Sequence, residues 1–346
     1  MNKKRIFVLL VVVVLAALVY LQVRAWRHFD WSKFREGTIG LNYLQVLGGV
    51  VLIHLADLLR AVRWKIFLRP SQPHASWKGL ISPQYVGFTG LALLGRPGEF
   101  IRPYLIARKE GVSFPSQLAI WFVERAFDIG AVTVIFCADV FLIPSMRDDY
   151  PAWRNFGFGL LILFLGFAAA QWALWRHGIV IARWVGERVS RFSPKKGADL
   201  EKKLLAVSEG MNTIHDAVSF FELCMLSLSI WLLVALAYRQ VTHAYPAYTG
   251  LPDLNLPEVI LLMGASVAGG VIQLPVVGGG SQLATIAVLA KTFGYQDSPE
   301  LAVSCGILLW LVTFISIVPL GLILSHREHL SLRKLSAESE VEAEAG

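Results

Sequence analysis

Residues 218–238, VSFFELCMLSLSIWLLVALAY, form an apolar run whose single charged residue is Glu222. A helix rises about 1.5 Å per residue, so about 20 such residues cross the hydrocarbon core of a bilayer. Comparable runs occur at residues 6–23, 40–59, 117–143, 155–175 and 301–325. The sequence therefore predicts an all-α, polytopic integral membrane protein with about six full spans.

The composition of the 346-residue chain agrees with a membrane protein and excludes other classes. Hydrophobic residues make up 55% and charged residues 16%, with a mean hydropathy of +0.56, whereas a soluble domain is roughly 45–50% apolar and about 25% charged. Polar low-complexity sequence is nearly absent, which excludes a disordered or coiled-coil chain. Cys137, Cys224 and Cys305 each lie in an apolar run, so neither a disulfide framework nor a thiolate metal site is predicted.

No motif of enzyme chemistry stands out in the sequence. Gly278, Gly279 and Gly280 lack the Lys-Ser/Thr pair of a phosphate-binding loop, and we find neither zinc-ligand spacing nor a nucleophile elbow. We therefore predict no catalytic residue, no metal and no cofactor. A net charge of +7 can indicate nucleic acid, but in a membrane chain basic residues are first of all topology signals, and no nucleic-acid partner is predicted.

The distribution of Lys and Arg predicts the orientation in the membrane. The N-terminus, residues 60–78, 108–109 and 176–203, and the end of the chain together hold 21 basic residues, and the opposite segments hold eight. This bias places both termini in the cytoplasm, in a cell (inner) membrane. The run at 6–23 is interpreted as a retained anchor. A cleaved secretory signal is the alternative, but its apolar core would be only about 7–15 residues and would end in a small-residue cleavage site.

Two shorter apolar stretches, residues 80–107 and 257–293, are interrupted by Gly and Pro. Cytoplasmic termini require an even number of full spans, so we interpret each stretch as a re-entrant hairpin, the two entering from opposite sides. Such a pair is typical of an inverted repeat with a substrate site at its interface. Two plain helical hairpins that pack for stability are the alternative.

One transmembrane domain, residues 1–330, is predicted to include a cytoplasmic connector at residues 176–216. Apolar residues recur in this connector at helical spacing, namely Leu200, Leu204, Val207, Met211 and Ile214. Such an amphipathic helix lies on an anionic leaflet or packs against the bundle. Residues 331–346 are rich in Glu and are predicted to form a disordered acidic tail.

Ionisable residues inside apolar sequence carry the functional prediction, because charges at membrane depth are costly and usually pair or line a pathway. The densest group comprises three Arg and three acids: Arg96, Glu99, Arg102, Glu124, Arg125 and Asp128. Glu124 and Asp128 are four residues apart and share one helix face. We interpret the group as a cradle in which Arg residues bind a lipid phosphate and carboxylates orient the guanidinium groups. An internally paired polar plug is the alternative.

A second polar group lies on the run that begins at residue 40. His54, Asp57 and Arg60 recur every three residues, which predicts a structural salt bridge near the cytoplasmic end. Arg60 and Arg63 are expected to snorkel to lipid phosphates. A proton relay through His54 and Asp57 is the alternative.

The later broken stretch contains Pro275, a glycine run that includes Gly279, and then Ser281 and Gln282. Glycines allow close approach of a ligand or of another helix, and Gln282 is a neutral hydrogen-bonding group. We predict that Gly279 and Gln282 line the outer half of a lipid path. A packing crossover is the alternative.

The Gly-Arg-Pro-Gly-Glu-x-x-Arg stretch from Gly95 to Arg102, the Glu124-Arg125-x-x-Asp128 helix and the late Pro/Gly-rich hairpin resemble a known family. This is the transmembrane, flippase-type domain of lysylphosphatidylglycerol synthases and their free-standing relatives, and the resemblance spans about residues 5–330. It implies an all-helical polytopic domain that handles lipids, without the cytosolic synthase domain. Relatives often carry Glu seven residues after the late proline, where this chain has Gln282.

The residues and the resemblance together predict a lipid flippase or transporter. Its substrate would be a phospholipid or polyprenyl-phosphate lipid, so the expected partners are membrane lipids with anionic phosphate headgroups. Arg96 and Arg102 would hold the phosphate, with Arg125 as a third group. The first alternative is an accessory protein that binds a lipid intermediate and presents it to a lipid-modifying enzyme without moving it. The second is an integral-membrane enzyme that acts on such a lipid.

Overall fold

The computed structural model describes residues 31–210, 216–271, 279–328 and 338, and every regular element among them is a helix. The predicted anchor at 6–23 and nearly all of the predicted tail lie outside these residues. The helices are α2 (Trp31–Ile39), α3 (Tyr43–Leu68), α4 (Trp77–Leu94), α5 (Ile101–Glu110), α6 (Phe114–Leu142), α7 (Pro144–Asp149), α8 (Pro151–Ser190), α9 (Pro194–Gly210), α10 (Ala217–His243), α11 (Leu256–Gly269), α12 (Gly279–Lys291), α13 (Pro299–Thr313) and α14 (Val318–Arg327). Short 3-10 helices include η1 (Arg96–Phe100) and η2 (Ala247–Thr249). The all-α prediction is confirmed.

Four of the described helical segments are long and apolar enough to cross a membrane: Tyr43–Leu68, Pro151–Ala173, Ala217–His243 and Pro299–Arg327. They coincide with four of the runs predicted as spans. The predicted span at 117–143 is helical as α6 but does not belong to this group, because it contains Glu124, Arg125, Asp128 and Asp139. The total number of spans therefore stays a prediction.

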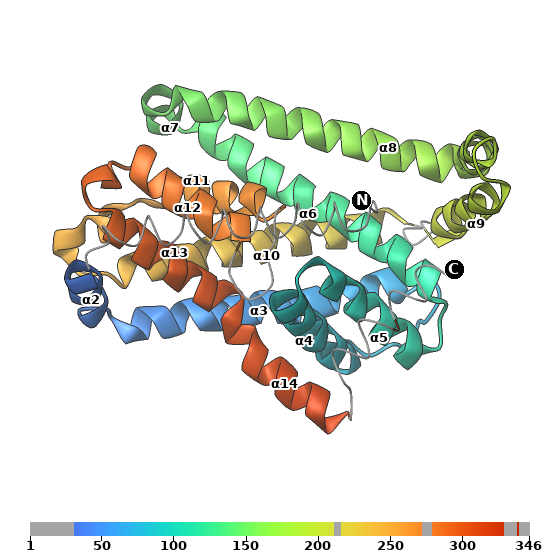
Figure 1. Ribbon diagram of the computed structural model, residues 1–346, viewed down its shortest axis with the longest axis horizontal. Helices are drawn as coiled ribbons and strands as arrows, with labels where there is room; N and C mark the ends of the chain where they lie inside the picture. Colours follow the sequence, from blue (N-terminus) through green and yellow to red (C-terminus); the bar gives the residue numbers. More distant parts are fainter. Residues whose placement is uncertain (1–30, 211–215, 272–278, 329–337, 339–346) are drawn as a thin grey trace, which may run out of the picture.

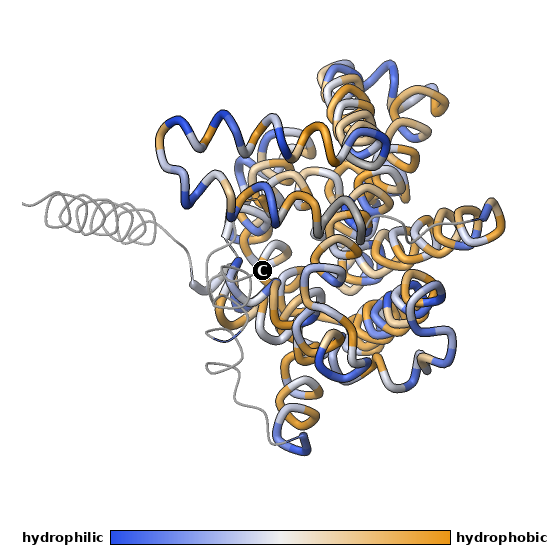
Figure 2. Tube along the Cα trace, turned by 90° about the vertical axis from the view of Figure 1, so that its right-hand side faces the viewer, coloured by the Kyte–Doolittle hydropathy of each residue, from blue (hydrophilic) through white to orange (hydrophobic). Residues whose placement is uncertain are grey.

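The long helices lie along the long axis of the molecule (Figure 1). α3 and α10 are antiparallel neighbours, since the Asn42 amide donates to the Ala244 carbonyl at 2.7 Å and Arg69 pairs with Glu222 at 2.9 Å at the other end. α6 packs against α10 on one side and α8 on the other. Figure 2, a view along the long axis, shows that hydrophobic residues make up much of the helical bundle. Helices that are apolar over most of their length suit a membrane-spanning bundle.

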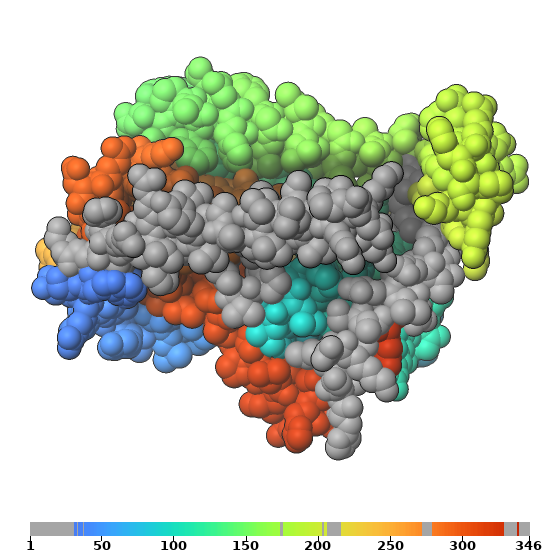
Figure 3. Space-filling view, in the orientation of Figure 1, coloured from blue at the N-terminus to red at the C-terminus, as the bar shows by residue number. Residues whose placement is uncertain are grey.

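α8 forms one edge of the molecule, and α9 projects at the end of the long axis (Figure 3). His177 has non-helical backbone angles inside α8, with φ −125° and ψ 22°. The apolar part of α8 ends before this residue, and α9 packs back against the basic part that follows. The break lies within two residues of the predicted start of the connector at 176, and the position of this connector relative to the membrane stays a prediction.

Both broken stretches form helical hairpins. α4 ends at Leu94 with Gly95 as its cap, and η1 makes a turn so tight that a Cβ added to Gly98 would overlap the backbone of Gly90. α5 returns along α4, where a Cβ added to Gly87 would overlap the Arg102 side chain. α11 and α12 form the second hairpin, with Gly269 against Gly280. Residues 272–278, which follow α11 in the sequence and precede α12, lie outside the described part of the chain. Re-entry into a membrane and the inverted repeat stay predictions.

We expect Gly269→Ala to lower the melting temperature of the purified protein in detergent. The added Cβ would overlap the Gly280 carbonyl oxygen and lie 2.7 Å from the Ala284 methyl group, so α11 and α12 would have to separate. Gly166→Ala is the matched control, since its Cβ position on α8 has no described atom within 4 Å apart from its chain neighbours and the backbone of its own helix. Alanine there should stabilise the helix by about 0.5–1 kcal/mol. Equal melting temperatures for the two variants would contradict the close packing of α11 on α12.

The charge bias predicts which end of the bundle faces the cytoplasm. Lys196 on α9 and Tyr248 on η2 are both exposed. In a variant without the three native cysteines, Lys196→Cys should react with a membrane-impermeant maleimide only after cells are permeabilised, whereas Tyr248→Cys should react in intact cells. Labelling of Lys196→Cys from outside would reverse the predicted orientation.

Candidate functional site

α6 carries two buried carboxylates at the centre of the candidate site. Ser113 caps the start of the helix by accepting a hydrogen bond from the Ser116 amide at 3.4 Å, and the helix then runs unbroken to Leu142. Glu124 and Asp128, one turn apart, are both buried. Ionised carboxylates at such positions need cationic or hydrogen-bonding partners, because transfer out of water is otherwise very costly.

Arg63 of α3 binds both carboxylates. Its Nη2 lies 2.5 Å from Glu124 Oε1, and its Nη1 lies 2.7 Å from Asp128 Oδ1 and 2.8 Å from Ser227 Oγ on α10. The expectation that Arg63 snorkels to lipid phosphates is therefore wrong, since its side chain is 0% exposed. The reason is that α3 packs so that its last turns face α6 and α10 rather than lipid.

Arg102 of α5 approaches Glu124 from the other side. Its two terminal nitrogens form a fork on the two Glu124 oxygens, and Nη1 also donates to Gln84 Oε1 at 3.1 Å. Its guanidinium carbon lies 4.3 Å from the centre of the Trp64 ring, a cation–π distance. A planar group that both forks and stacks is a role for Arg rather than Lys.

Arg125 is the partly open member of the cluster. Its Nη2 lies 3.2 Å from Asp128 Oδ2 and 3.4 Å from Glu124 Oε2, its guanidinium carbon lies 5.8 Å from the Trp121 ring, and 37% of its side chain is exposed. Within the described residues, neither Arg125 Nε nor Arg63 Nε has an acceptor. The cluster therefore has unused hydrogen-bond donors.

We call Arg63, Arg102, Arg125, Glu124 and Asp128 the ionic cluster. It contains three guanidinium groups and two carboxylates, so it carries one excess positive charge. Trp231 adds a neutral donor, its Nε1 lying 3.2 Å from Asp128 Oδ1. A buried excess charge attracts an anion more strongly than the same charge in water, because the local dielectric is low.

Within the described residues, no direct ion pair links Arg96 or Glu99 to the ionic cluster. They pair with each other, and Arg96 Nη2 donates to the carbonyls of Gly270 at 2.9 Å and Val271 at 2.8 Å. These carbonyls follow the C-terminus of α11, where a cation is favourable. Arg96 thus connects the two broken hairpins, so the Arg residues predicted to share one phosphate have different partners.

A family model described as lysylphosphatidylglycerol synthase TM region matches residues 6–321 of this chain. The chain belongs to this family. The resemblance inferred from the Gly-Arg-Pro-Gly-Glu-x-x-Arg stretch and the α6 motif is confirmed, and the protein is a membrane protein of a lipid-handling family. Comparisons with curated proteins and with solved structures found no match.

In this member of the family, the second polar group is a salt bridge. Arg60 Nη1 lies 2.8 Å from Asp57 Oδ1, as predicted. His54 does not complete a relay with Asp57 through a direct hydrogen bond. Its Nδ1 lies 2.9 Å from the Tyr85 hydroxyl, and the two rings stack with centres 5.6 Å apart. This pairing ties α3 to α4.

Gly279 and Gln282, which are predicted to line the outer half of a lipid path, lie on α12. This helix packs between α11 and α13. Gly279 is buried at the start of this helix, with φ 56°. Gln282 is half-buried, and its backbone carbonyl lies beside Gly306 of α13. This placement shows packing against α13 at Gln282, and contact of either residue with a lipid stays a prediction. No group of three or more potential metal ligands occurs among the described residues.

Sequence reasoning missed Arg63 as a cluster member. It is one turn beyond Arg60, and that spacing alone does not distinguish an exposed cation from a buried one. The available signal was the apolar sequence Ile66-Phe67-Leu68 that follows it, which places Arg63 inside the helix rather than at its end.

Proposed function

We propose that this protein binds a lipid through an anionic phosphate at the ionic cluster and moves that lipid between the leaflets of the cell membrane. The observation that carries the proposal is the excess of one guanidinium in a cluster that is buried within an apolar bundle except at Arg125. Three Arg residues face two carboxylates, and two guanidinium nitrogens have no acceptor within the described residues. A phosphate group at the open side of the cluster would supply the missing negative charge and an acceptor for Arg125.

Arg125 is the group that first meets the headgroup in this proposal. Its partly exposed guanidinium lies over Trp121, while Arg63 and Arg102 are almost fully enclosed. Glu124 and Asp128 keep all three guanidinium groups aligned before the lipid arrives. Such preorganisation limits the side-chain ordering that binding would otherwise require.

An accessory protein that binds the lipid for a lipid-modifying enzyme is the second candidate function. The observation that favours it is the rigid anchoring of Arg63 and Arg102, each held by more than one hydrogen bond. A rigid cradle is suited to holding a headgroup, whereas transport also requires the cradle to open on both sides.

Reconstitution into vesicles distinguishes the two candidates. Fluorescent phosphatidylglycerol, a polyprenyl monophosphate and phosphatidylcholine would each be placed in one leaflet, and their movement followed by a leaflet-specific quencher. Transport predicts faster movement of a phosphate-monoester or anionic lipid than in protein-free vesicles, and little effect on zwitterionic phosphatidylcholine. Saturable binding of the anionic lipids without movement would select the accessory role, and an absence of binding would contradict both.

Arg102→Lys should retain the fold but weaken the affinity for the anionic lipids. The charge is unchanged, but lysine cannot form the fork on Glu124 or stack on Trp64 in the same way. Arg96→Lys is the comparison variant, because Arg96 binds the end of α11 instead. Unchanged lipid affinity in a well-folded Arg96→Lys/Arg102→Lys double variant would contradict the phosphate cradle.

A further inference from the structure

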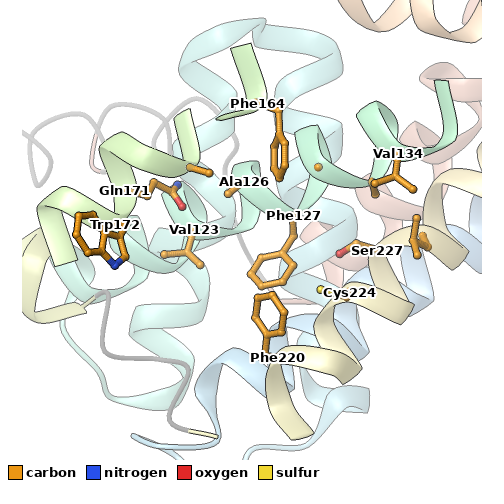
Figure 4. A pocket seen from close by; sticks show the side chains of 14 residues that line it. Val123, Ala126, Phe127, Val134, Phe164, Gln171, Trp172, Phe220, Cys224 and Ser227 are labelled. Atoms are coloured by element: carbon orange, nitrogen blue, oxygen red, sulfur yellow. The ribbon is translucent and has the colours of Figure 1, made fainter. Parts of the chain in front are cut away.

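A groove of about 560 Å³ lies between α6, α8 and α10, on a different face of α6 from the ionic cluster. Val123, Phe127, Gly130 and Val134 recur at helical spacing along this side of α6, whereas Glu124 and Asp128 lie on the stripe that faces Arg63. Figure 4 shows the side chains that surround the groove, among them Phe164 and Trp172 of α8 and Phe220 and Cys224 of α10.

The lining of the groove is almost entirely apolar. Its two clearly polar side chains already have protein partners, since Ser227 Oγ accepts from Arg63 at 2.8 Å and Gln171 Nε2 donates to the Phe122 carbonyl at 2.8 Å. No charged residue lines it. Its volume lies within the range of roughly 300–1,000 Å³ that is usual for ligand pockets, and a chain without polar atoms fits the chemistry of these walls.

The end of the groove adjoins a basic segment. Arg176 follows Trp172 by four residues, one turn along α8. Residues 176–203 contain eight Lys and Arg against three acids, Glu187, Asp199 and Glu201. A lipid whose chain enters the groove would therefore meet positive charge at its headgroup end, which favours an anionic headgroup.

We propose that this groove binds one hydrocarbon chain of an anionic membrane lipid, with the headgroup held at the basic end of α8 that begins at Arg176. This inference rests on the proposed function, because it treats the groove as a docking site from which the transported lipid reaches the ionic cluster. α8 forms one wall and otherwise presents apolar side chains outward, including Ile162, Leu163 and Leu165, so a chain enters sideways from the bilayer.

Photo-crosslinking tests the groove. The full-length protein in vesicles would be illuminated with phosphatidylglycerol that carries a diazirine in one acyl chain, and crosslinked peptides would be mapped by mass spectrometry. We expect crosslinks concentrated in residues 123–134, 164–172 and 220–228, and competed more effectively by unlabelled phosphatidylglycerol than by phosphatidylcholine with the same chains. Uniform crosslinking over the outer apolar surface, with equal competition by both lipids, would indicate bulk bilayer lipid and overturn the proposal.

Two matched pairs of variants sharpen the test. Ala168→Phe fills the groove and should remove most of these crosslinks, whereas Ala169→Phe, on the exposed neighbouring position, should not. Arg176→Gln should reduce the preference for phosphatidylglycerol about five-fold, the effect of roughly one basic residue near an anionic surface. Arg154→Gln, at the other end of α8, should leave it unchanged. Equal crosslinking in Ala168→Phe and Ala169→Phe would overturn the assignment of the groove.

The two proposals fail separately. Uniform crosslinking together with lipid movement that still depends on Arg102 would contradict lipid binding in the groove but support the proposed function. Crosslinks confined to the groove without any lipid movement would support lipid binding in the groove but contradict transport.

Discussion

Glu124→Gln should destabilise the protein by about 3–5 kcal/mol, as expected when one member of a buried ion-pair network is removed. Glu124 meets Arg63, Arg102 and Arg125 at once. The amide keeps the size of the carboxyl group but leaves three guanidinium groups facing Asp128 alone. The excess then rises from one positive charge to two, and a charge removed from water without a partner is costly.

Thermal and denaturant unfolding of the purified protein would measure this effect. The matched control is Asp148→Asn, because Asp148 pairs with Arg147 at 2.9 Å on the exposed helix α7. Arg147 holds the pKa of Asp148 below its ordinary value, but water screens this pair, so its loss should leave the melting temperature nearly unchanged. Equal destabilisation by the two substitutions would show that the ionic cluster has no special role in the fold.

A double variant separates charge balance from shape. Glu124→Gln/Arg125→Gln leaves two guanidinium groups and one carboxylate, so its excess charge equals that of the wild type. It should therefore be more stable than Glu124→Gln alone, although the Arg63 and Arg102 hydrogen bonds to a carboxylate are still lost. A double variant less stable than both single variants would contradict a balance of charge as the cause.

The helices of this protein are largely predictable from its sequence, because apolar runs of spanning length have few alternatives to a helix in lipid. Residues 218–238, for example, lie inside α10. The two hairpins also follow from local chemistry, since Gly95 and Pro97 interrupt the helix at the turn between α4 and α5. Gly87 and Gly90 of α4 then allow α5 to pack closely, as Gly269 and Gly280 do between α11 and α12.

The candidate site is predictable only where its partners are local. The four-residue spacing places Glu124 and Asp128 on one face, and the structure confirms that geometry. The packing of α3 against α6 decides which cation reaches these carboxylates. No local sequence pattern indicates that this cation is Arg63. The same limit applies to Arg96, which lies close in sequence to Arg102 but binds the end of α11.

Arg125→Gln should lower lipid binding rather than stability, the opposite of the effect expected for Glu124→Gln. The fold should persist, and the affinity for anionic phosphate lipids should fall about tenfold or more, which is the effect of losing one charge-assisted hydrogen bond. The substitution leaves Arg63 and Arg102 against Glu124 and Asp128, which is a neutral set. Asp128 still accepts from Arg63 at 2.7 Å and from Trp231 at 3.2 Å, and Glu124 keeps its bonds to Arg63 and Arg102. No buried carboxylate is left without a partner, so stability has little reason to fall.

The measurement combines melting temperature with lipid binding in the same preparation. Arg125→Lys should give an intermediate affinity, because it keeps the charge but lacks the planar guanidinium group and its additional donors. Arg69→Gln is the control for general electrostatics, since Arg69 is an exposed cation paired with Glu222 away from the cluster. An equal loss of affinity in Arg69→Gln would assign binding to surface charge. A stable Arg125→Gln variant with unchanged affinity would show that the excess charge of the ionic cluster does not bind the lipid.

A large loss of lipid affinity in Arg125→Gln alone, at constant stability, distinguishes a ligand site from a polar plug. The reason is that a purely structural cluster would lose stability and binding together.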